Sequence, residues 1–374
     1  MPSTDYVIPS PNSGHEDWFG SVGPEDRDAA LRTALAEAGL TTPITTETFT
    51  PPDGPPIAAY VDSGDNAAIN AYAREELAGG ATALLFRLFR QPGPRDITAI
   101  LDGLPIDKID LHCSLRYPGQ DPAELFRDLV HYLRREGYDL WTVSGSVDFD
   151  PLLDWTEPPF PPLIRLLYFV SRWMPRFRVL QVNAAGFNNG VATADVELAL
   201  AVAKGIEYLR QLEARGYPPA LANRHLKFAV TVGTSFYGDV AKLRALRILW
   251  AEALGELGIT NPPPTRISAH TDLATLTADG DENRLRLATQ ALAAKLSGAD
   301  QLFLAPVEGI DQSPTATGRL TARQLQVRIF TQPDLQKLPD VAYLDELTQG
   351  LCTAARNRYQ RVMAQGGFAQ ATEF

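Results

Sequence analysis

The sequence is poor in cysteine and has no long apolar run. Its 374 residues include two cysteines, Cys113 and Cys352, which lie too far apart in the chain to form a metal-binding pair. Both are expected to be buried core thiols and not redox groups. No stretch is apolar enough to span a bilayer and there is no secretory signal, so the cytoplasm is the expected compartment.

Positive charge is also scarce. Lys and Arg number 34 against 45 Asp and Glu, which gives a net charge of −11. This balance argues against a protein that follows nucleic-acid phosphates, and a phosphate-bearing ligand would need a local basic patch. Basic residues gather in Ser171–Arg178 and at Lys242, Arg244 and Arg247. These groups fit either phosphate contacts or a solvated helix face, and we favour the latter.

Short motifs of several enzyme classes are missing. No Gly-rich dinucleotide or phosphate-binding fingerprint follows any β-type segment. Neither the Gly-x-Ser-x-Gly of hydrolases nor the His-Glu-x-x-His of zinc proteases occurs. The histidines show no metal-ligand spacing. We therefore expect no metal site in this chain.

The sequence does have a regular alternation of β-type and helical segments. Eight β-type segments occur, at Ile57–Asp62, Ala83–Leu88, Ile109–Ser114, Leu140–Ser146, Val179–Ala184, Leu226–Gly233, Arg266–Thr271 and Gln301–Val307. Helical patterns lie between and after them, at Asn66–Gly79, Asp96–Leu101, Pro122–Glu136, Leu163–Trp173, Thr193–Arg215, Asp239–Leu257, Glu282–Leu296, Ala322–Phe330 and Leu344–Ala364. This order predicts an α/β fold, a single (β/α)₈ TIM barrel, and not an open doubly wound sheet.

The region before the first strand has a different composition. Residues 1–55 are rich in Pro, Ser, Thr, Gly and acidic residues and are expected to form an N-terminal arm. One amphipathic stretch within it, Pro24–Leu40, predicts a short helix that stops near Gly39. Residues 56–374 are expected to form the barrel domain.

Several predicted strands alternate polar and apolar residues. Parallel barrel strands are ordinarily apolar on both faces. Because the outer face must pack on helices, the polar register is expected to point into the barrel, where it forms either a satisfied hydrogen-bond network or a ligand channel. The residues that would face this lumen or a ligand are Asp110, His112, Ser114, Gln181, Asn183, Ser268 and His270, with Arg266 in the same register.

Long segments of the chain resemble the methylmalonyl-CoA mutase family, the adenosylcobalamin-dependent radical isomerases. The resemblance covers most of residues 55–368 and is strongest at ELALAVAKGIEYLR, TSFYGDVAKLRALRILWAEAL and RISAHTD. The segments LDGLPIDKIDLHCSL and GSVDFDPL resemble the small, non-catalytic subunits of two-chain members. The family implies a barrel whose lumen, lined by small polar residues, holds the CoA arm.

The chain departs from the family pattern at the cobalamin site. The resemblance implies a cobalamin-binding domain with an Asp-x-His-x-x-Gly motif. Since the sequence ends about where the barrel ends, no such domain is expected. A near-match begins at Asp110 and His112, but Leu115 stands where the Gly belongs, so we interpret it as coincidental.

The positions that carry the family chemistry are also altered. Tyr60 stands in the first strand without the rest of the family's Arg-Gln-Tyr-Ala-Gly-Phe segment. The stretch expected to supply a substrate-gripping Arg carries Asp154 and Glu157 instead, which would repel an acidic acyl-CoA. Phe187-Asn188 replaces the family's Tyr-His pair, and Asn188 cannot carry a proton. We expect no catalytic residue here and treat Tyr60, Phe187 and Asn188 as degenerate positions.

The resemblance and these losses together predict a non-catalytic small subunit of a heterodimeric mutase. A homologous large subunit would bind adenosylcobalamin and carry the isomerisation, and this chain would bind no cofactor itself. Two alternatives stay open. In the first, the barrel retains acyl-CoA binding and acts as a substrate-binding subunit or as a non-radical enzyme that uses His270, His112 or Asn188. In the second, the chain is a self-associating scaffold without a mutase partner. His270 is itself interpreted as a mark of family ancestry.

Overall fold

The fold was analysed in a computed structural model of the chain. It describes residues 29, 31–33, 35–36, 56–61, 65–115, 122–154, 158–187, 193–309, 315–331 and 340–372. Of the predicted helix Pro24–Leu40, the described positions are helical and Leu35 is buried. Asn188, Glu157 and most of the expected N-terminal arm lie outside the described residues. No helix in the described part is long and apolar enough to cross a membrane.

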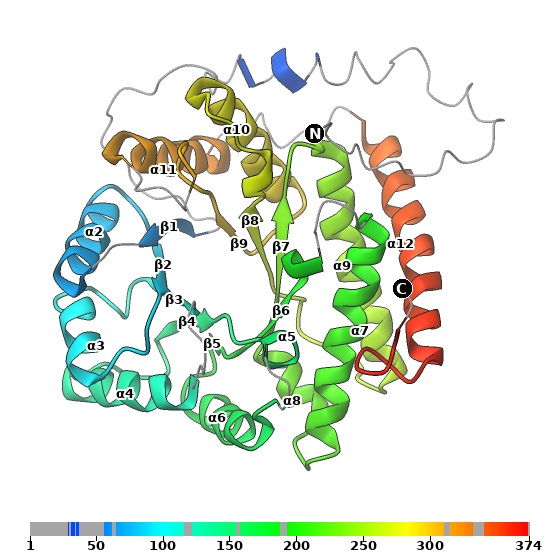
Figure 1. Ribbon diagram of the computed structural model, residues 1–374, viewed down its shortest axis with the longest axis horizontal. Coiled ribbons are helices and arrows are strands. Elements are labelled where there is room, and N and C mark those ends of the chain that lie inside the picture. The colour runs from blue at the N-terminus through cyan, green and yellow to red at the C-terminus, as the bar shows by residue number, and fades with distance from the viewer. Residues whose placement is uncertain are drawn as a thin grey trace.

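Parallel strands form one sheet at the centre of the molecule (Figure 1). Their order is β5-β4-β3-β2-β1-β9-β8-β7-β6. In chain order the strands are β1 (Ile57–Val61), β2 (Ala83–Leu88), β3 (Asp110–Leu115), β4 (Ser144–Val147), β5 (Phe177–Arg178), β6 (Leu180–Asn183), β7 (Leu226–Val232), β8 (Ile267–Thr271) and β9 (Gln301–Phe303).

The sheet is a nearly closed barrel. The two edge strands, β5 and β6, are separated by Val179 alone, so the chain itself joins the edges. The Gln181 N–H donates to the carbonyl of Phe149 at 2.9 Å, which links β6 to the segment that follows β4. The predicted (β/α)₈ barrel is confirmed, with the expected strand Val179–Ala184 replaced by the β5–β6 pair.

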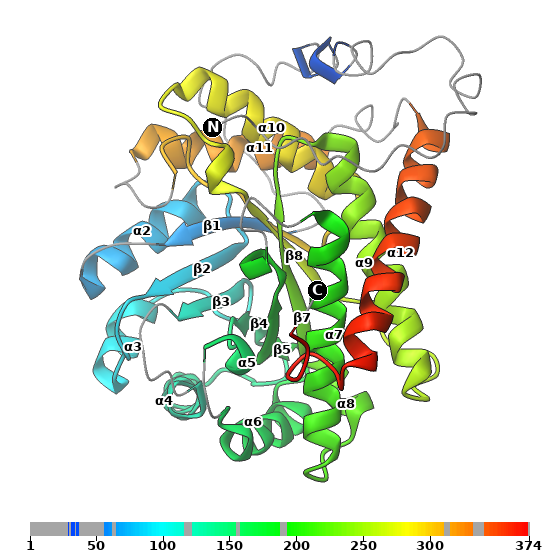
Figure 2. The same cartoon turned by 45° about the vertical axis from the view of Figure 1, so that its right-hand side comes forward.

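Helices surround the barrel on its outer side (Figures 1 and 2). They are α2 (Asn66–Ala78), α3 (Pro94–Leu101), α4 (Pro122–Arg135), α5 (Pro151–Asp154), α6 (Phe160–Trp173), α7 (Ala194–Glu213), α8 (Pro219–Arg224), α9 (Phe236–Glu256), α10 (Gly280–Leu296), α11 (Ala316–Thr331) and α12 (Val341–Ala364). Short 3₁₀ turns η1 (Ala184–Phe187) and η2 (Leu273–Thr275) follow β6 and β8. The last helix, α12, lies outside the ring, where it packs against α7 and α9.

The alternation of side chains along the strands divides the core in two. Outward residues such as Val61, Phe86 and Leu111 belong to the large apolar cluster shared with the helices. A second, small cluster lies inside the barrel, and it consists of Ala58, Ala83, Leu85 and Phe303 with Tyr60 packed against it. The lumen therefore has an apolar patch contributed by β1, β2 and β9, and other strands contribute polar side chains to it.

Candidate functional site

An aromatic ring, Phe303 of β9, occupies the middle of the lumen. The imidazole of His270 stacks on it with ring centroids 4.9 Å apart, and the imidazole of His112 meets it edge-on at 5.3 Å. Tyr60 packs against the same ring at 6.0 Å. Two predicted lumen residues, His112 and His270, and the degenerate position Tyr60 thus surround a side chain that was not predicted from the sequence.

His112 is the centre of a buried polar network. Its Nδ1 lies 2.8 Å from Ser146 Oγ, and its Nε2 lies 2.7 Å from the amide nitrogen of Gln301. Since an amide nitrogen only donates, Nε2 is the acceptor, and the ring proton sits on Nδ1 toward Ser146. Lys227 Nζ donates to the same Ser146 hydroxyl at 2.7 Å. These bonds join β3, β4, β7 and β9 across the interior.

Burial sets the charge state of this network. Burial, followed by the repulsion of the Lys227 ammonium, holds the pKa of His112 well below its usual value. A neutral imidazole agrees with the tautomer inferred from Gln301. Burial also lowers the pKa of Lys227 from 10.5 to about 8, although the Asp148 carboxylate acts in the opposite direction. Lys227 is 5% exposed, so its charged form is costly.

This cost predicts a pH-dependent stability. Between pH 8 and 10.5 the folded chain binds fewer protons at Lys227 than the unfolded chain, so the free energy of unfolding should rise with pH. Lys227 should contribute about 3 kcal/mol to this rise in the free energy of unfolding. In Lys227→Met this rise should be absent, and the variant should gain stability relative to wild type below pH 8. Urea unfolding of both proteins at a series of pH values measures their free energies of unfolding.

Lys108→Met is the matched control, because Lys108 is exposed on the loop before β3. Its stability should follow the wild-type curve at every pH. Parallel curves for Lys227→Met and wild type would show that Lys227 does not titrate in this range.

The second predicted histidine, His270, has a separate set of neighbours. Its Nε2 lies 3.1 Å from Ser268 Oγ, and its Nδ1 lies 3.4 Å from the hydroxyl of Tyr60. The Ser268 hydroxyl also donates to the Phe228 carbonyl at 3.4 Å. His270 therefore contacts side chains of the lumen and is partly buried there.

The remaining predicted lumen residues lie at its two ends. Asp110 accepts a hydrogen bond from the Ser144 hydroxyl and lies 3.4 Å from the Gln301 amide. At the carboxyl end of β3, the Ser114 hydroxyl donates to Asp148 at 2.6 Å. Gln181 is buried, and its side-chain oxygen accepts no hydrogen bond from any described residue.

A buried ion pair lies beyond β4. Lys204 of α7 donates to Asp150 at 2.6 Å, and the side chains are 0% and 2% exposed. Asp150 also accepts from the Tyr208 hydroxyl and from the backbone N–H of Asn183 at 2.7 Å. The carboxylate therefore fixes the end of β6 to α7, and it explains the position of the predicted residue Asn183.

Phe187, the residue at one of the degenerate family positions, packs against this ion pair. Its ring lies 5.4 Å from Lys204 Nζ and 5.9 Å from the ring of Phe368, which follows α12. An aromatic face next to a buried ammonium is a favourable cation–π contact. These contacts give Phe187 a packing role at the base of the C-terminal segment.

A further charged cluster is buried at the carboxyl ends of β7 and β8. Lys242 of α9 lies 3.4 Å from Glu197 and 3.3 Å from Asp239, and all three are at most 2% exposed. Asp239 also accepts from the Gly233 N–H at 2.8 Å. Burial raises the pKa of both Glu197 and Asp239, although Lys242 opposes it. Lys242, interpreted from sequence as part of a solvated face, is thus a buried partner of two acids.

The burial of these charged residues was not predicted, although the sequence held a signal for some of them. In α7, the charged residues Glu197 and Lys204 stand among apolar residues. They are seven positions apart and so share one face of the helix. In a predicted strand, the polar residue Lys227 stands between the apolar residues Leu226 and Phe228. The predicted lumen residues show the same alternation of polar and apolar positions. Gln301 had no such pattern around it.

The described residues contain no cluster that could hold a metal ion, and His112 does not fit the role of a cobalamin axial ligand. No group of three or more His, Cys, Asp or Glu in the described part of the chain could hold a metal ion. His112, the histidine of the near-match to the family motif, is 2% exposed and both of its ring nitrogens already have partners. Burial also raises the pKa of the Cys113 thiol to about 12, which keeps it from acting as a thiolate ligand.

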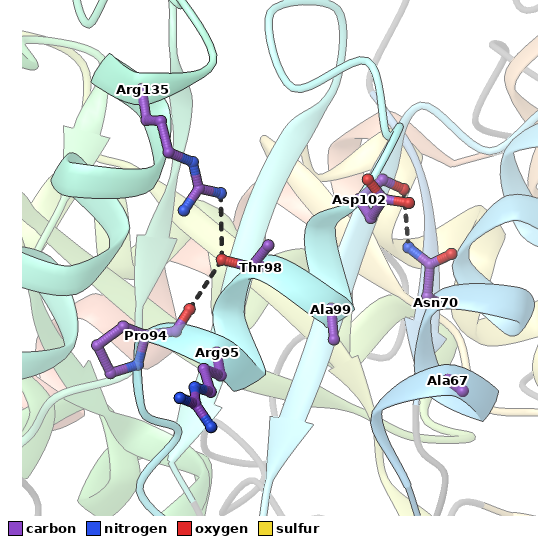
Figure 3. A pocket seen from close by; sticks show the side chains of 8 residues that line it. All are labelled: Ala67, Asn70, Pro94, Arg95, Thr98, Ala99, Asp102 and Arg135. Carbon is purple, nitrogen blue, oxygen red and sulfur yellow. Dashed lines mark hydrogen bonds between the residues drawn. The ribbon is translucent and has the colours of Figure 1, made fainter.

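An open hollow of about 650 Å³ lies outside the barrel, between α2, α3 and α4 (Figure 3). Its polar groups bond mostly to one another. Arg135 donates to the Thr98 hydroxyl at 3.2 Å, and Thr98 donates to the Pro94 carbonyl at 2.9 Å. Asn70 donates to the Asp102 carbonyl at 3.0 Å. None of the predicted site residues lines this hollow.

Known sequences place the chain among related proteins. The sequence profile described as Methylmalonyl-CoA mutase matches residues 93–374. The chain is 28% identical over 330 residues to the probable methylmalonyl-CoA mutase small subunit of Mycobacterium tuberculosis (84% of this chain, 53% of that protein). It is 28% identical over 333 residues to the small subunit from Porphyromonas gingivalis (83% and 52%). It is 26% identical over 294 residues to the large subunit from Propionibacterium freudenreichii (74% and 40%). The chain spans about half the length of these small subunits.

Proposed function

Because this chain belongs to the methylmalonyl-CoA mutase family, we propose that it acts as a non-catalytic small subunit. It pairs with a homologous large subunit, which binds the acyl-CoA and adenosylcobalamin and carries the interconversion of methylmalonyl-CoA and succinyl-CoA. The names of the small-subunit and large-subunit relatives support this proposal.

The observation that carries the proposal is a set of direct side-chain contacts across the lumen. Gln301 reaches His112 at 2.7 Å, and Lys227 reaches Ser146 at 2.7 Å, across the space that a CoA arm takes in the family. Phe303 lies between the two histidines. A ligand on the barrel axis would have to break these hydrogen bonds, and it would leave buried polar groups without partners.

The degenerate positions support the same conclusion. Tyr60 points its hydroxyl at His270 and at the Phe303 carbonyl, both at 3.4 Å, so it takes part in the packing of the lumen. Phe187 packs on Lys204 and Phe368. We propose that these residues have lost catalytic roles and kept structural ones, and that this chain binds no cofactor.

Co-expression with the large subunit of the source organism tests the pairing. We expect the two chains to leave a size-exclusion column as one complex, and isomerase activity to require the large subunit. The isolated chain should release no heat on titration with succinyl-CoA. Two separate peaks would contradict the pairing, and saturable binding by the isolated chain would favour the alternative of an acyl-CoA-binding barrel.

A further inference from the structure

The outer surface of α6 combines exposed aromatic residues with arginines. This helix lies between α4 and α8 on the outside of the barrel (Figures 1 and 2). We define the α6 face as the exposed residues Arg165, Tyr168, Arg172 and Trp173 of this helix, together with Trp141. Its three large aromatic residues are 52%, 41% and 54% exposed (Tyr168, Trp173 and Trp141, respectively).

Local geometry brings these residues together. Arg165, Tyr168 and Arg172 follow helical spacing and form one solvent-facing stripe, while Trp173 is the last residue of the helix. Trp141 and Trp173 each precede a strand at its amino end, and these strands, β4 and β5, are paired neighbours. Trp141 and Trp173 therefore lie at the same end of the barrel, and the stripe of Arg165, Tyr168 and Arg172 runs along α6 toward that end.

The aromatic groups are held in place without being buried. The ring of Tyr168 meets the ring of Tyr217 edge-on at 4.7 Å, and its hydroxyl donates to the Gly216 carbonyl at 3.3 Å. The Arg172 guanidinium lies 5.2 Å from the centre of the Trp173 ring. Rigid aromatic side chains lose little conformational entropy when a partner covers them.

The charge of the α6 face is opposite to that of the whole chain. No Asp or Glu occurs from residue 158 to residue 194, whereas the chain carries a net charge of −11. Within the described residues, Arg165, Arg172 and the nearby Arg176 make no ion pair. Some other exposed arginines have carboxylate partners, such as Arg356 with Glu252 at 2.9 Å.

We infer that the α6 face docks a protein surface that presents carboxylates around an apolar patch, and that this surface belongs to the large subunit proposed above. Trp, Tyr and Arg are the residues that carry most binding energy at protein interfaces. The unpaired guanidinium groups select an acidic occupant by charge complementarity. The strongly acidic remainder of the chain would repel a nucleic acid. The inference rests on the proposed function.

Charge reversal tests it. Arg165→Glu/Arg172→Glu should weaken the complex with the large subunit at least about tenfold, and should reduce the dependence of its affinity on salt. Trp173→Ala should weaken it by a similar factor with the salt dependence kept. Arg95→Glu, at an exposed arginine of α3, is the matched control and should stay within about twofold of wild type. Surface plasmon resonance against the immobilised large subunit at two salt concentrations measures all four proteins.

The outcomes separate the inference from the function on which it rests. If the wild-type chain binds the large subunit and the α6 variants bind it with the same affinity, the inference is overturned but the proposed function is not. Absence of binding by wild type overturns both. Self-association of the isolated chain that the α6 variants abolish would assign the face to a second copy and would also overturn the inference. Because every substituted residue is exposed, an unchanged thermal midpoint should show that the variants remain folded.

Discussion

Gly145→Ala is expected to destabilise the barrel by more than about 4 kcal/mol. Gly145 lies in β4 with φ +151°, and a Cβ at this position would lie 1.8 Å from the carbonyl oxygen of Leu111 in β3. The obstructing atom is backbone, so no side-chain rotation relieves the clash, and β4 would have to move away from its neighbour. That shift would also separate Ser146 from His112.

Gly137→Ala separates the clash from the effect of backbone conformation. Gly137 has φ +82°, and nothing lies within 4 Å of the position where its Cβ would be. This control should therefore lose only the roughly 1–2 kcal/mol that a side chain costs in a left-handed conformation. Free energies of unfolding from urea titrations compare the two variants. Equal losses would mean that β4 has room for a methyl group beside the Leu111 carbonyl, which would contradict the close approach of the two strands.

Asp150→Asn is expected to cost about 3–5 kcal/mol. The substitution keeps the shape of the side chain, and an amide oxygen still accepts from Tyr208 or the Asn183 N–H. It removes the carboxylate that neutralises the Lys204 ammonium, which is 0% exposed. Removal of the charge of Asp150 from beside this buried ammonium causes most of the loss.

The double variant Asp150→Asn/Lys204→Met should recover a large part of that stability, because the buried charge is then absent as well. Glu124→Gln is the surface control. Glu124 pairs with Arg127 at 3.1 Å, but both side chains are about half exposed, so its loss should stay below about 1 kcal/mol. If the double variant is no more stable than Asp150→Asn, the cost does not come from the charge of Lys204.

The barrel was predictable because its signal is local. The strand expected at Ala83–Leu88 occurs with those bounds, and each helix expected between and after the strands overlaps an observed one, although α11 begins at Ala316 and not at Ala322. The strand expected from Leu140 begins only at Ser144, because Asp139 organises a turn first. Asp139 accepts from the Trp141 N–H with its side chain and from the Thr142 hydroxyl with its backbone carbonyl.

The shortest helices were missed for a related reason. Helices α5 and α8 each comprise less than two turns, so no periodic pattern develops in either of them. Proline at the first position was the available signal in both, at Pro151 and Pro219.

The filling of the lumen was beyond the reach of sequence periodicity. Alternation identified which register of a strand is polar, but not which side chains meet. His112 and Gln301 are 189 positions apart, and only closure of the barrel brings them within hydrogen-bond distance. Asp150 and Lys204 likewise belong to different elements, and a pattern within either element does not reveal the pair. Whether the polar register formed a network or a channel therefore depended on the tertiary structure.

The number of succinyl-CoA molecules bound by the assembled complex of this chain and the large subunit tests the central claim most directly. Calorimetric titration of the purified complex gives that number. Contacts among His112, Gln301, Lys227 and Ser146 cross the barrel, and we propose that the acyl-CoA site therefore belongs to the partner, which predicts one site per pair of chains. A second site, lost when His112 and Phe303 are replaced, would contradict it.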